Sequence, residues 1–530
     1  MENPQFYVRK ASGIVRNISA WDALTGNIVW SGHMWAFIYV IGASILFPGV
    51  DLPITPLIVF PLIVLQIIPF YFFSITMPRA GGDYIWVSRT LHPSLGFSWN
   101  FLFAMMQVSF VGIISGWVLD PGLRSVLLVW GTLTGNAGLV AWVSSFLSPL
   151  NLFIMSSILV VIAGIINFLP TKFSTRTYIA IFVISLFCAF VYAGLMLGVG
   201  HEGFVQNFNR ISGADYAGII KAAQSAGYNT GFTVIGTVLG LMYSFQALTG
   251  GFNYSIYLAG EVKSVNRSQV IAQLGCAVAV TLISYMLYEV TWTVAGAEFV
   301  KGAAFLAGTG NSAWTLPMLP YLNYLVVFAT DNPYLGILPG IGLMLAAYGT
   351  VLTIVAMVTR MFFAYSFDRI LPSAISSVEN RFHVPRNAVA LVTVIAIFYA
   401  FMFYYTPVLT YYAYGSIGMW LPQIFVGIAA IVFPYRRKDI FEKAPKIVQT
   451  KLGGVPVITI LGFYVVGCSA FNTIIPIMPI YTGAAGVNPI YVLAIFLTML
   501  PAPIIYAIAY WYNRRRGLDM GVAFRELPPA

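Results

Sequence analysis

The chain has 530 residues, of which 59% are hydrophobic and only 8% are charged, and its formal net charge is +10. A soluble domain carries about 25% charged residues, so this composition excludes a globular protein with a water-exposed surface. The Lys and Arg residues lie in short loops rather than along one face, which argues against nucleic-acid binding. The sequence therefore predicts an all-α integral membrane protein.

Long apolar runs predict about twelve transmembrane helices, because each run is long enough to cross a hydrocarbon core about 30 Å thick. In chain order these runs are 19–47, 54–76, 95–119, 151–169, 176–199, 232–258, 268–297, 335–365, 387–406, 411–434, 456–480 and 489–512. The N-terminal residues contain no apolar core followed by a small-residue cleavage site, so we expect the first span to be retained.

The stretch 121–148 is apolar enough to form a thirteenth span, and the distribution of basic residues decides against it. With twelve spans and a cytoplasmic N-terminus, 23 of the 27 Lys and Arg residues fall in inside segments. A thirteenth span would leave 8 inside against 19 outside, the reverse of the positive-inside rule. We therefore place 121–148 outside, as an amphipathic or re-entrant segment. Both termini are then expected in the cytoplasm of a cell-membrane protein.

Two predicted spans contain interruptions, at 24–33 in the first and 243–253 in the sixth. Each has two glycines and several polar residues where an unbroken helix would be apolar. In lipid, an interrupted backbone is tolerated only where it lines a cavity or a site. Paired interruptions five spans apart predict a transporter site between inverted repeats, and close packing of small residues is the alternative.

This pattern divides the chain into two cytoplasmic tails, two five-helix repeats and two further helices. The expected boundaries are 1–18 for the N-tail, 19–199 and 232–434 for the repeats, 456–512 for helices 11 and 12, and 513–530 for the C-tail.

An unwound segment exposes amides at one half-helix and carbonyls at the other, which suits a zwitterion. We expect a substrate carboxylate on the amides of 31–33 and an ammonium on carbonyls near Asn27, Ile28 and 245–247. The full set of predicted substrate-binding residues is Asn27, Ile28, Val29, Trp30, Ser31, Gly32, His33, Phe245, Ala247, Thr249, Gly250, Gly251 and Asn253.

Three stretches on the predicted cytoplasmic side match one family in the expected order. They read Met-Pro-Arg-Ala-Gly-Gly-Asp-Tyr at 77–84, Leu-Ala-Gly-Glu-Val at 258–262, and Arg360 followed by Asp-Arg-Ile-Leu-Pro at 368–372 and Val-Pro-Arg-Asn-Ala at 384–388. On these motifs the chain resembles the amino acid-polyamine-organocation (APC) superfamily over nearly its whole length. The resemblance implies amino-acid transport and a LeuT-type fold, with helices 1 and 6 broken.

The chain departs from the family pattern at its substrate site. Trp30 stands where relatives usually have glycine. Ala247 or Thr249 stands where many relatives carry a gating aromatic residue, a role that a nearby phenylalanine would then take. Asn253 replaces the commoner glutamate, which removes one anionic anchor for basic substrates.

Candidate residues for ion coupling are Glu289, His33, Thr350 and Thr353. Glu289, inside the seventh span, is either a proton carrier or a satisfied acid near the end of its helix. His33 could sense or transfer protons near neutrality, whereas a hydrogen-bonded packing role is the alternative. The two threonines correspond to Na⁺ ligands of sodium-coupled relatives, although threonine commonly bonds its own helix. Ser185 stands where proton-driven relatives carry a lysine, so that device is not expected.

Asp22 and Glu261 are expected to cap helices or to pair with nearby bases such as Arg16 and Lys263. The whole pattern predicts a secondary active transporter that moves an amino acid by alternating access, coupled to H⁺ or Na⁺ or working by exchange, and surrounded by membrane lipid. A carrier of another nitrogenous solute, such as a polyamine or nucleobase, is the alternative, and a channel is disfavoured because no filter motif occurs. Because the sequence contains no Walker loop, zinc spacing or nucleophile elbow, we expect neither enzymatic activity nor a bound metal or cofactor.

Overall fold

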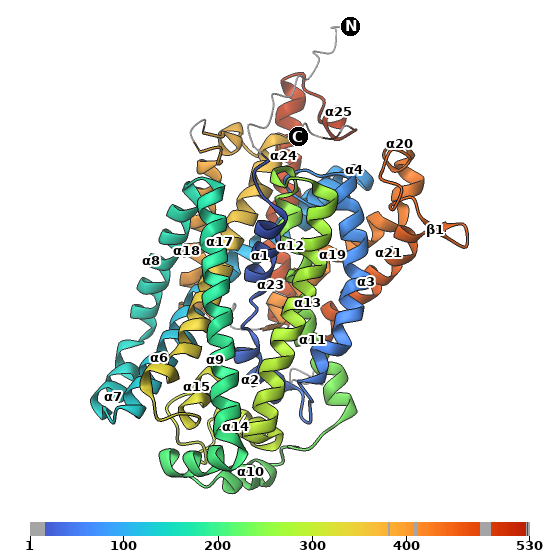
Figure 1. Cartoon of the computed structure of the whole chain (residues 1–530). Coiled ribbons are helices and arrows are strands. Elements are labelled where there is room, and N and C mark those ends of the chain that lie inside the picture. Colours follow the sequence, from blue (N-terminus) through green and yellow to red (C-terminus); the bar gives the residue numbers. More distant parts are fainter. Residues whose placement is uncertain (1–15, 380–381, 407–411, 478–488, 526, 528–530) are drawn as a thin grey trace.

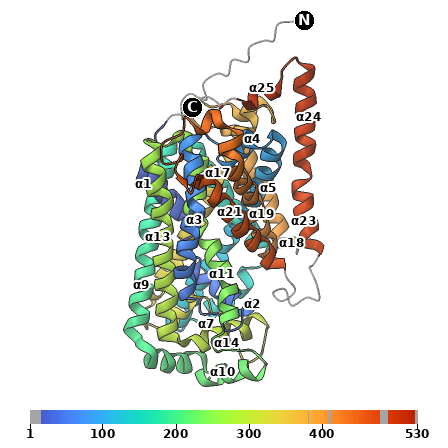
Figure 2. The same cartoon turned by 90° about the vertical axis from the view of Figure 1, so that its right-hand side faces the viewer.

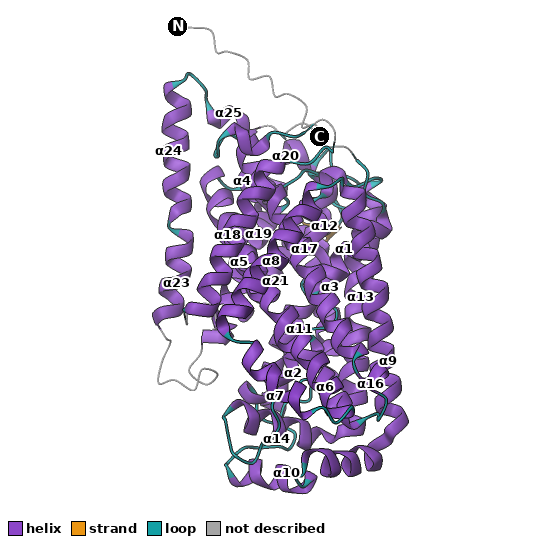
Figure 3. Cartoon of the chain, turned by 90° about the vertical axis from the view of Figure 1, so that its left-hand side faces the viewer, coloured by secondary structure: helices purple, strands orange, loops and turns teal. Residues whose placement is uncertain are grey.

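The computed structural model describes residues 16–379, 382–406, 412–477, 489–525 and 527. Within these ranges, twelve helices are long and apolar enough to cross a membrane. They run roughly side by side in one bundle with almost no strand (Figures 1 and 3). The chain is therefore a multi-pass membrane protein, as predicted. Residues 1–15 of the predicted N-tail lie outside the described residues, as do the ends of several other predicted segments.

The first part of the chain, up to residue 225, forms ten α-helices and one π-helix. These elements are α1 (Ala20–Ser31), α2 (Ala36–Leu46), α3 (Ile54–Thr76), α4 (Asp83–Thr90), α5 (Pro93–Trp117), η1 (Val118–Leu123), α6 (Arg124–Leu133), α7 (Ala137–Phe146), α8 (Pro149–Phe168), α9 (Thr171–Ser212) and α10 (Tyr216–Ser225).

The remaining described residues form more helices and one two-stranded hairpin. The elements up to the ninth span are α11 (Val234–Leu248), α12 (Gly250–Tyr257), η2 (Ala259–Glu261), α13 (Val265–Thr291), η3 (Trp292–Gly296), α14 (Ala297–Gly308), α15 (Leu322–Leu325), η4 (Val326–Phe328), α16 (Pro333–Gly336), α17 (Leu338–Phe367), η5 (Ser373–Ser376) and α18 (Arg386–Tyr405). They are followed by α19 (Tyr412–Arg436), α20 (Lys438–Phe441), β1 (Lys451–Leu452), β2 (Val455–Pro456), α21 (Val457–Ile474), η7 (Ile475–Ile477), α23 (Pro489–Met499), α24 (Pro501–Arg515) and α25 (Met520–Arg525).

The start of α1 and the end of α24 lie at the same end of the bundle, which we call the terminal face (top of Figure 1). The opposite end, the distal face, carries α7, α10 and α14. Helix boundaries follow local signals: the side chains of Ser19 and Asp22 form a capping box at the start of α1, and Pro93 and Pro149 occupy first-turn positions.

The stretch 121–148 is not a span of its own. Asp120 leaves the helical region with φ −130° and ψ 105°, and Pro121 follows it, so the chain bends after α5. Helices α6 and α7 then pack against each other at the distal face (Figure 1). The twelve-span prediction, which rested on charge, is confirmed for the described residues.

The bundle has a buried centre and a lipid-facing periphery. The span formed by α1 and α2 is 83% buried and contacts α9, α12, α13 and α17, whereas the last span is only 17% buried. Figure 2 shows α24 standing along one edge of the bundle. Peripheral helices expose large apolar side chains such as Ile158, Val183 and Ile508, the pattern expected next to lipid.

Candidate transport site

Helix 1 is interrupted in the middle of the bundle. Gly32 adopts a left-handed conformation (φ 67°, ψ 63°) and ends α1, and α2 begins only at Ala36. Among the described residues, the backbone N–H groups of His33 and Met34 have no hydrogen-bond partner, although both residues are fully buried. These amides precede the positive end of the α2 dipole, so the interruption can receive an anion such as a carboxylate.

The break in helix 6 is much smaller than predicted. Helices α11 and α12 meet at Thr249, whose backbone remains helical (φ −55°, ψ −32°) and whose N–H bonds to the Phe245 carbonyl at 3.0 Å. Adjacent glycines serve close packing here. A Cβ at Gly250 would overlap Ser31 and Trp30 of α1, and one at Gly251 would lie 3.2 Å from the Gln273 carbonyl oxygen.

Two carbonyls predicted to hold the ammonium are already engaged. The Ile28 carbonyl accepts the Ser31 hydroxyl at 2.8 Å. The Phe245 carbonyl accepts both the N–H and the hydroxyl of Thr249, at 3.0 and 2.5 Å. Because a carbonyl oxygen has two lone pairs, Phe245 is saturated in this conformation. Ile28, whose usual helical donor Gly32 bonds to Val29 instead, retains one lone pair.

The two predicted asparagines have structural contacts. Asn27 donates to the Gly251 carbonyl (3.1 Å) and accepts the N–H of Ser255 (2.8 Å), so it joins α1 to α12. Asn253 donates to the Thr249 carbonyl in its own helix (3.2 Å). In this conformation Asn27 stabilises the contact between helices 1 and 6, whereas Asn253 stabilises helix 6 itself.

The coupling candidates next to the break differ in their surroundings. His33 Nε2 lies 2.6 Å from the Ser185 hydroxyl oxygen, which is also 2.7 Å from the Ile181 carbonyl oxygen. Thr350 donates to the Val29 carbonyl at 2.9 Å and thus joins α17 to α1. Thr353 bonds only to carbonyls of its own helix among the described groups.

Between the break and the terminal face lies a buried ion pair. Arg360 of α17 binds Glu261 of η2 through Nε at 2.8 Å, and both side chains are less than 5% exposed. The sequence predicts a helix cap or a nearby base such as Lys263 as the partner of Glu261. In the structure its partner is Arg360. The N-terminal segment adds a clamp, because Ile18 donates to the Glu261 carbonyl (3.0 Å) and accepts the Lys263 N–H (2.9 Å).

A second buried ion pair lies in the same layer. Arg89 of α4 contacts Asp368 at 2.7 Å, and the Tyr84 hydroxyl donates to the same carboxylate at 2.7 Å. Nearby, Asn100 donates to Asp83 at 2.7 Å. Burial raises the pKa of Asp83 to about 6, although hydrogen bonds to its carboxylate oppose this effect.

These contacts bring together the three motifs that carry the family resemblance. Gly81 and Gly82 both have positive φ, and a Cβ at Gly82 would crowd Tyr257 at the end of α12. Gly260 of the second motif approaches the backbone N of Ala80 so closely that a Cβ would lie 3.2 Å away. Because Arg360 and Asp368 come from the third motif, all three meet in one closed layer, which we call the terminal seal.

A family model described as amino acid permease matches residues 22–500. The chain belongs to the amino acid permease family. This assignment agrees with the motif resemblance to the APC superfamily, and the family it identifies is a family of transporters.

The permease is also similar to the glutamate/serine transporter AimA of Bacillus subtilis (strain 168), with 24% identity over 374 residues. The match covers 67% of the permease and 61% of the length of this curated relative.

Sequence reasoning missed Gln107 of α5 as a site residue. Its side chain is fully buried, and neither its oxygen nor its nitrogen has a partner among the described residues. One turn away, Phe103 stacks on Tyr257 of helix 6 (5.9 Å, 16°), so this face of α5 is turned toward α12. A lone carboxamide inside an apolar span was the available signal, because polar groups at membrane depth usually have a role.

The indole Nε1 of Trp30 and the Oε1 of Gln246 are likewise buried without a partner among the described residues. Together with Gln107 of α5, these residues give the first, third and sixth spans one buried polar atom each, with which a substrate could form a hydrogen bond.

Glu289 lies away from this site, near the distal end of α13. It is half-buried and lines a cleft of about 470 Å³ together with Asp51, Tyr285 and Trp292. Burial raises the pKa of Asp51, an effect that Lys301 opposes. Glu289 thus lies near the end of α13, and its role in coupling stays a prediction.

Proposed function

We propose that this permease is a secondary active transporter that carries an amino acid by alternating access. The observation that carries the proposal is the interruption of helix 1, where two buried amides without partners face the centre of a permease fold. The proposed mechanism is rocking of one five-helix repeat (19–199) against the other (232–434) around this interruption.

The substrate carboxylate would bind the N–H groups of His33 and Met34. The ammonium would bind the Ile28 carbonyl, which keeps a free lone pair, whereas the Phe245 carbonyl becomes available only if Thr249 rotates away. Gln107 and Trp30 supply unsatisfied polar atoms for the rest of the substrate. This division assigns the charged ends of the zwitterion to the helix 1 interruption and its side chain to Gln107 of α5 and Trp30 of α1.

A neutral or acidic amino acid fits this site better than a basic one. The buried polar atoms without partners come from amides and an indole rather than from carboxylates, and Asn253 replaces the usual glutamate. The similarity to a glutamate/serine transporter points the same way. We therefore propose serine and glutamate as the first substrates to test.

The terminal face is proposed to lie on the cytoplasmic side of the cell membrane, because the basic loops are concentrated there. Ion coupling is proposed at the break, either through Na⁺ on the Thr350 hydroxyl and the Val29 carbonyl or through a proton on His33. In the present conformation the terminal seal would prevent release to the cytoplasm.

Uptake by the purified permease in proteoliposomes tests the proposal. Radiolabelled amino acids, a polyamine and a nucleobase would be compared with an imposed Na⁺ gradient, a pH gradient, or choline in place of Na⁺. We expect saturable uptake of serine or glutamate and acceleration of efflux by external substrate. Uptake of only the polyamine or nucleobase would contradict the substrate class, and flux that does not saturate would indicate a channel.

A site variant checks where binding occurs. Gln107→Leu keeps the volume of the side chain and removes its polar atoms, so it should raise KM by about tenfold, the effect of losing about one hydrogen bond. Gln449→Leu, at a loop position on the terminal face, is the matched control. Equal KM values for both variants would exclude Gln107 from the site.

A further inference from the structure

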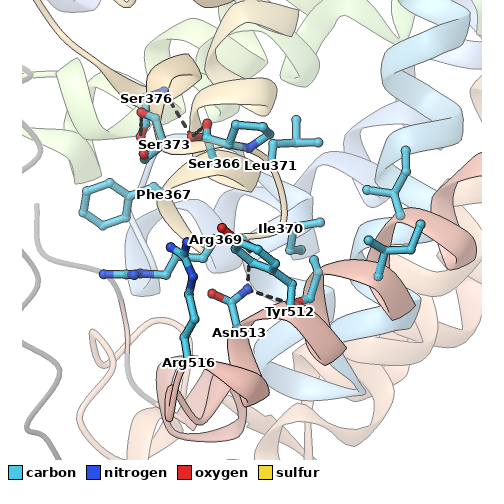
Figure 4. Close-up of a pocket in the computed structure, with 14 residues that line it drawn as sticks. Ser366, Phe367, Arg369, Ile370, Leu371, Ser373, Ser376, Tyr512, Asn513 and Arg516 are labelled. Atoms are coloured by element: carbon cyan, nitrogen blue, oxygen red, sulfur yellow. Dashed lines mark hydrogen bonds between the residues drawn. The ribbon is translucent and has the colours of Figure 1, made fainter.

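A cavity of about 750 Å³ opens at the terminal face between α24 and the segment that follows α17 (Figure 4). One wall consists of residues in the range 366–376, and the other is a single face of α24. None of these residues belongs to the helix 1 interruption or to the ion pairs of the terminal seal. The cavity therefore needs a separate explanation.

The α24 wall changes in character along the helix. The residues that line it follow helical spacing and are Ile505, Ile508, Ala509, Tyr512, Asn513 and Arg516. In this order the side chains are apolar, then aromatic with a hydroxyl, then polar, then cationic. This order complements a phospholipid, whose acyl chain is apolar, whose glycerol region is polar and whose phosphate is anionic.

The dimensions of this wall agree with one leaflet of a bilayer. Arg516 lies eleven positions after Ile505 along the helix, which corresponds to a rise of about 16 Å. One half of the hydrocarbon core is about 15 Å thick. The three arginines 514–516 mark the level of the headgroups, so Ile505 lies near the middle of the membrane.

The polar end of the cavity is positively charged. Arg369 comes from the segment after α17 and Arg516 from the end of α24, and no acidic residue lines the cavity. The neighbouring Asp368 is paired with Arg89. Figure 4 shows Arg369 between the serines 366, 373 and 376, which lie in α17 and η5, on one side and Tyr512, Asn513 and Arg516 on the other. Basic pockets between membrane helices are typical sites for anionic lipid headgroups.

The last span also has few protein contacts to hold it. It is the least buried of the twelve candidate spans, at 17%. At the terminal face, the Asn513 side chain donates to the Arg369 carbonyl at 3.1 Å and so connects α24 to the opposite wall. A molecule that filled the cavity beside this bond would contact both walls and stabilise the position of α24.

We propose that this cavity binds one anionic phospholipid. Its phosphate lies between Arg369 and Arg516, its glycerol region beside Tyr512, and an acyl chain along Ile505 and Ile508. The inference is independent of the transported solute, because it concerns the attachment of a peripheral helix.

The test is the thermal stability of the full-length permease in a neutral detergent, with added phosphatidylglycerol, phosphatidylcholine or glycerol 3-phosphate. Phosphatidylglycerol should raise the Tm by several degrees, because a ligand bound only by the folded state stabilises it. Loss of one arginine should weaken the apparent affinity by about fivefold, and loss of both by about 30-fold. The variant is Arg369→Gln with Arg516→Gln, and its matched control is Arg514→Gln with Arg515→Gln.

Full retention of the Tm shift in the Arg369/Arg516 variant would overturn the proposal, as would equal shifts with phosphatidylcholine. An equal shift with glycerol 3-phosphate would also overturn it, in favour of a soluble phosphate. If the arginine variant does not fold, a second pair decides. Ala509→Phe fills the cavity and should abolish the shift, whereas Ala507→Phe on the neighbouring exposed face should preserve it.

Discussion

The contacts toward the two ends of the bundle differ in their chemistry. The terminal seal contains two buried ion pairs, Arg360–Glu261 and Arg89–Asp368. On the distal side of the break, the described closing contacts are aromatic: Trp35 meets Trp117 at 5.4 Å, and Tyr39 meets Tyr243 at 5.3 Å. We call this pair of contacts the distal seal.

The ion pairs described at the distal face lie at its surface instead. Arg210 and Asp331 are 58% and 78% exposed, and Arg124 and Asp120 are partly exposed. Buried charges tolerate little separation, because each partner alone would be an unpaired ion in a medium of low polarity. Aromatic rings lose far less when they move apart. We therefore expect separation of the contacts in the terminal seal to cost more free energy than separation of those in the distal seal.

The largest expected effect comes from breaking the terminal seal. Glu261→Gln leaves the buried Arg360 without its counterion, which should destabilise this conformation by about 3–5 kcal/mol. Cys276, whose sulfur lies 3.9 Å from the Ser31 hydroxyl, is a native reporter of access to the break. In a background of Cys188→Ser and Cys468→Ser, an impermeant thiol reagent applied at the terminal face should label Cys276 much faster in the variant.

The matched control is Asp439→Asn, which removes one partner of the Arg437–Asp439 pair, whose carboxylate is 62% exposed. An exposed pair contributes about 0–1 kcal/mol, so labelling should hardly change. Equal labelling rates in the Glu261 and Asp439 variants would contradict the special role of the buried pair.

A smaller, pH-dependent effect is expected at Asp83, which lies in the terminal seal. Because burial raises its pKa to about 6, the ionised form is disfavoured in this conformation. The resulting stabilisation by protonation is present at low pH and is lost as the pH rises from about 4 through about 6. Labelling of Cys276 from the terminal face should therefore increase with pH by up to about 100-fold more than in Asp83→Asn, because the pKa is raised by about two units. A ratio between the two proteins that stays constant with pH would refute this account.

The smallest effect is expected at the distal seal. Trp35→Phe keeps an aromatic ring but reduces its contact area with Trp117. This loss should destabilise the distal seal by about 0.5–1.5 kcal/mol. Labelling of Cys276 from the distal face should rise only a few-fold, with Trp142→Phe at an exposed position as the control. An effect as large as that of Glu261→Gln would remove the proposed difference between the seals.

Local signals predicted much of this architecture. Span lengths follow from apolar runs, the fate of 121–148 follows from loop charges, and Gly32 ends α1 where the pattern placed a break. The continuity of helix 6 was not predictable, because Gly250 is used for contact with α1, a partner more than 200 residues away. The pairing of Glu261 with Arg360, 99 residues apart, was hidden for the same reason.

The substrate-site prediction depends in part on features that the sequence does not specify. The amides of helix 1 could be predicted from one glycine-containing segment. The saturation of the Phe245 carbonyl depends on the rotamer of Thr249, which sequence does not specify. Gln107 was overlooked because a single amide in an apolar span gives no periodic signal, although its burial without a partner is plain in three dimensions.

The backbone bonds of Ile18 have a mechanical consequence. Ile18 is bonded on one side to Glu261 and on the other to Lys263, so the chain entering α1 is tied to the connection between helices 6 and 7. A force applied to the chain before Ile18 would therefore act on the residue that holds Arg360. A molecule that bound this part of the chain would then act through Glu261 on its ion pair with Arg360.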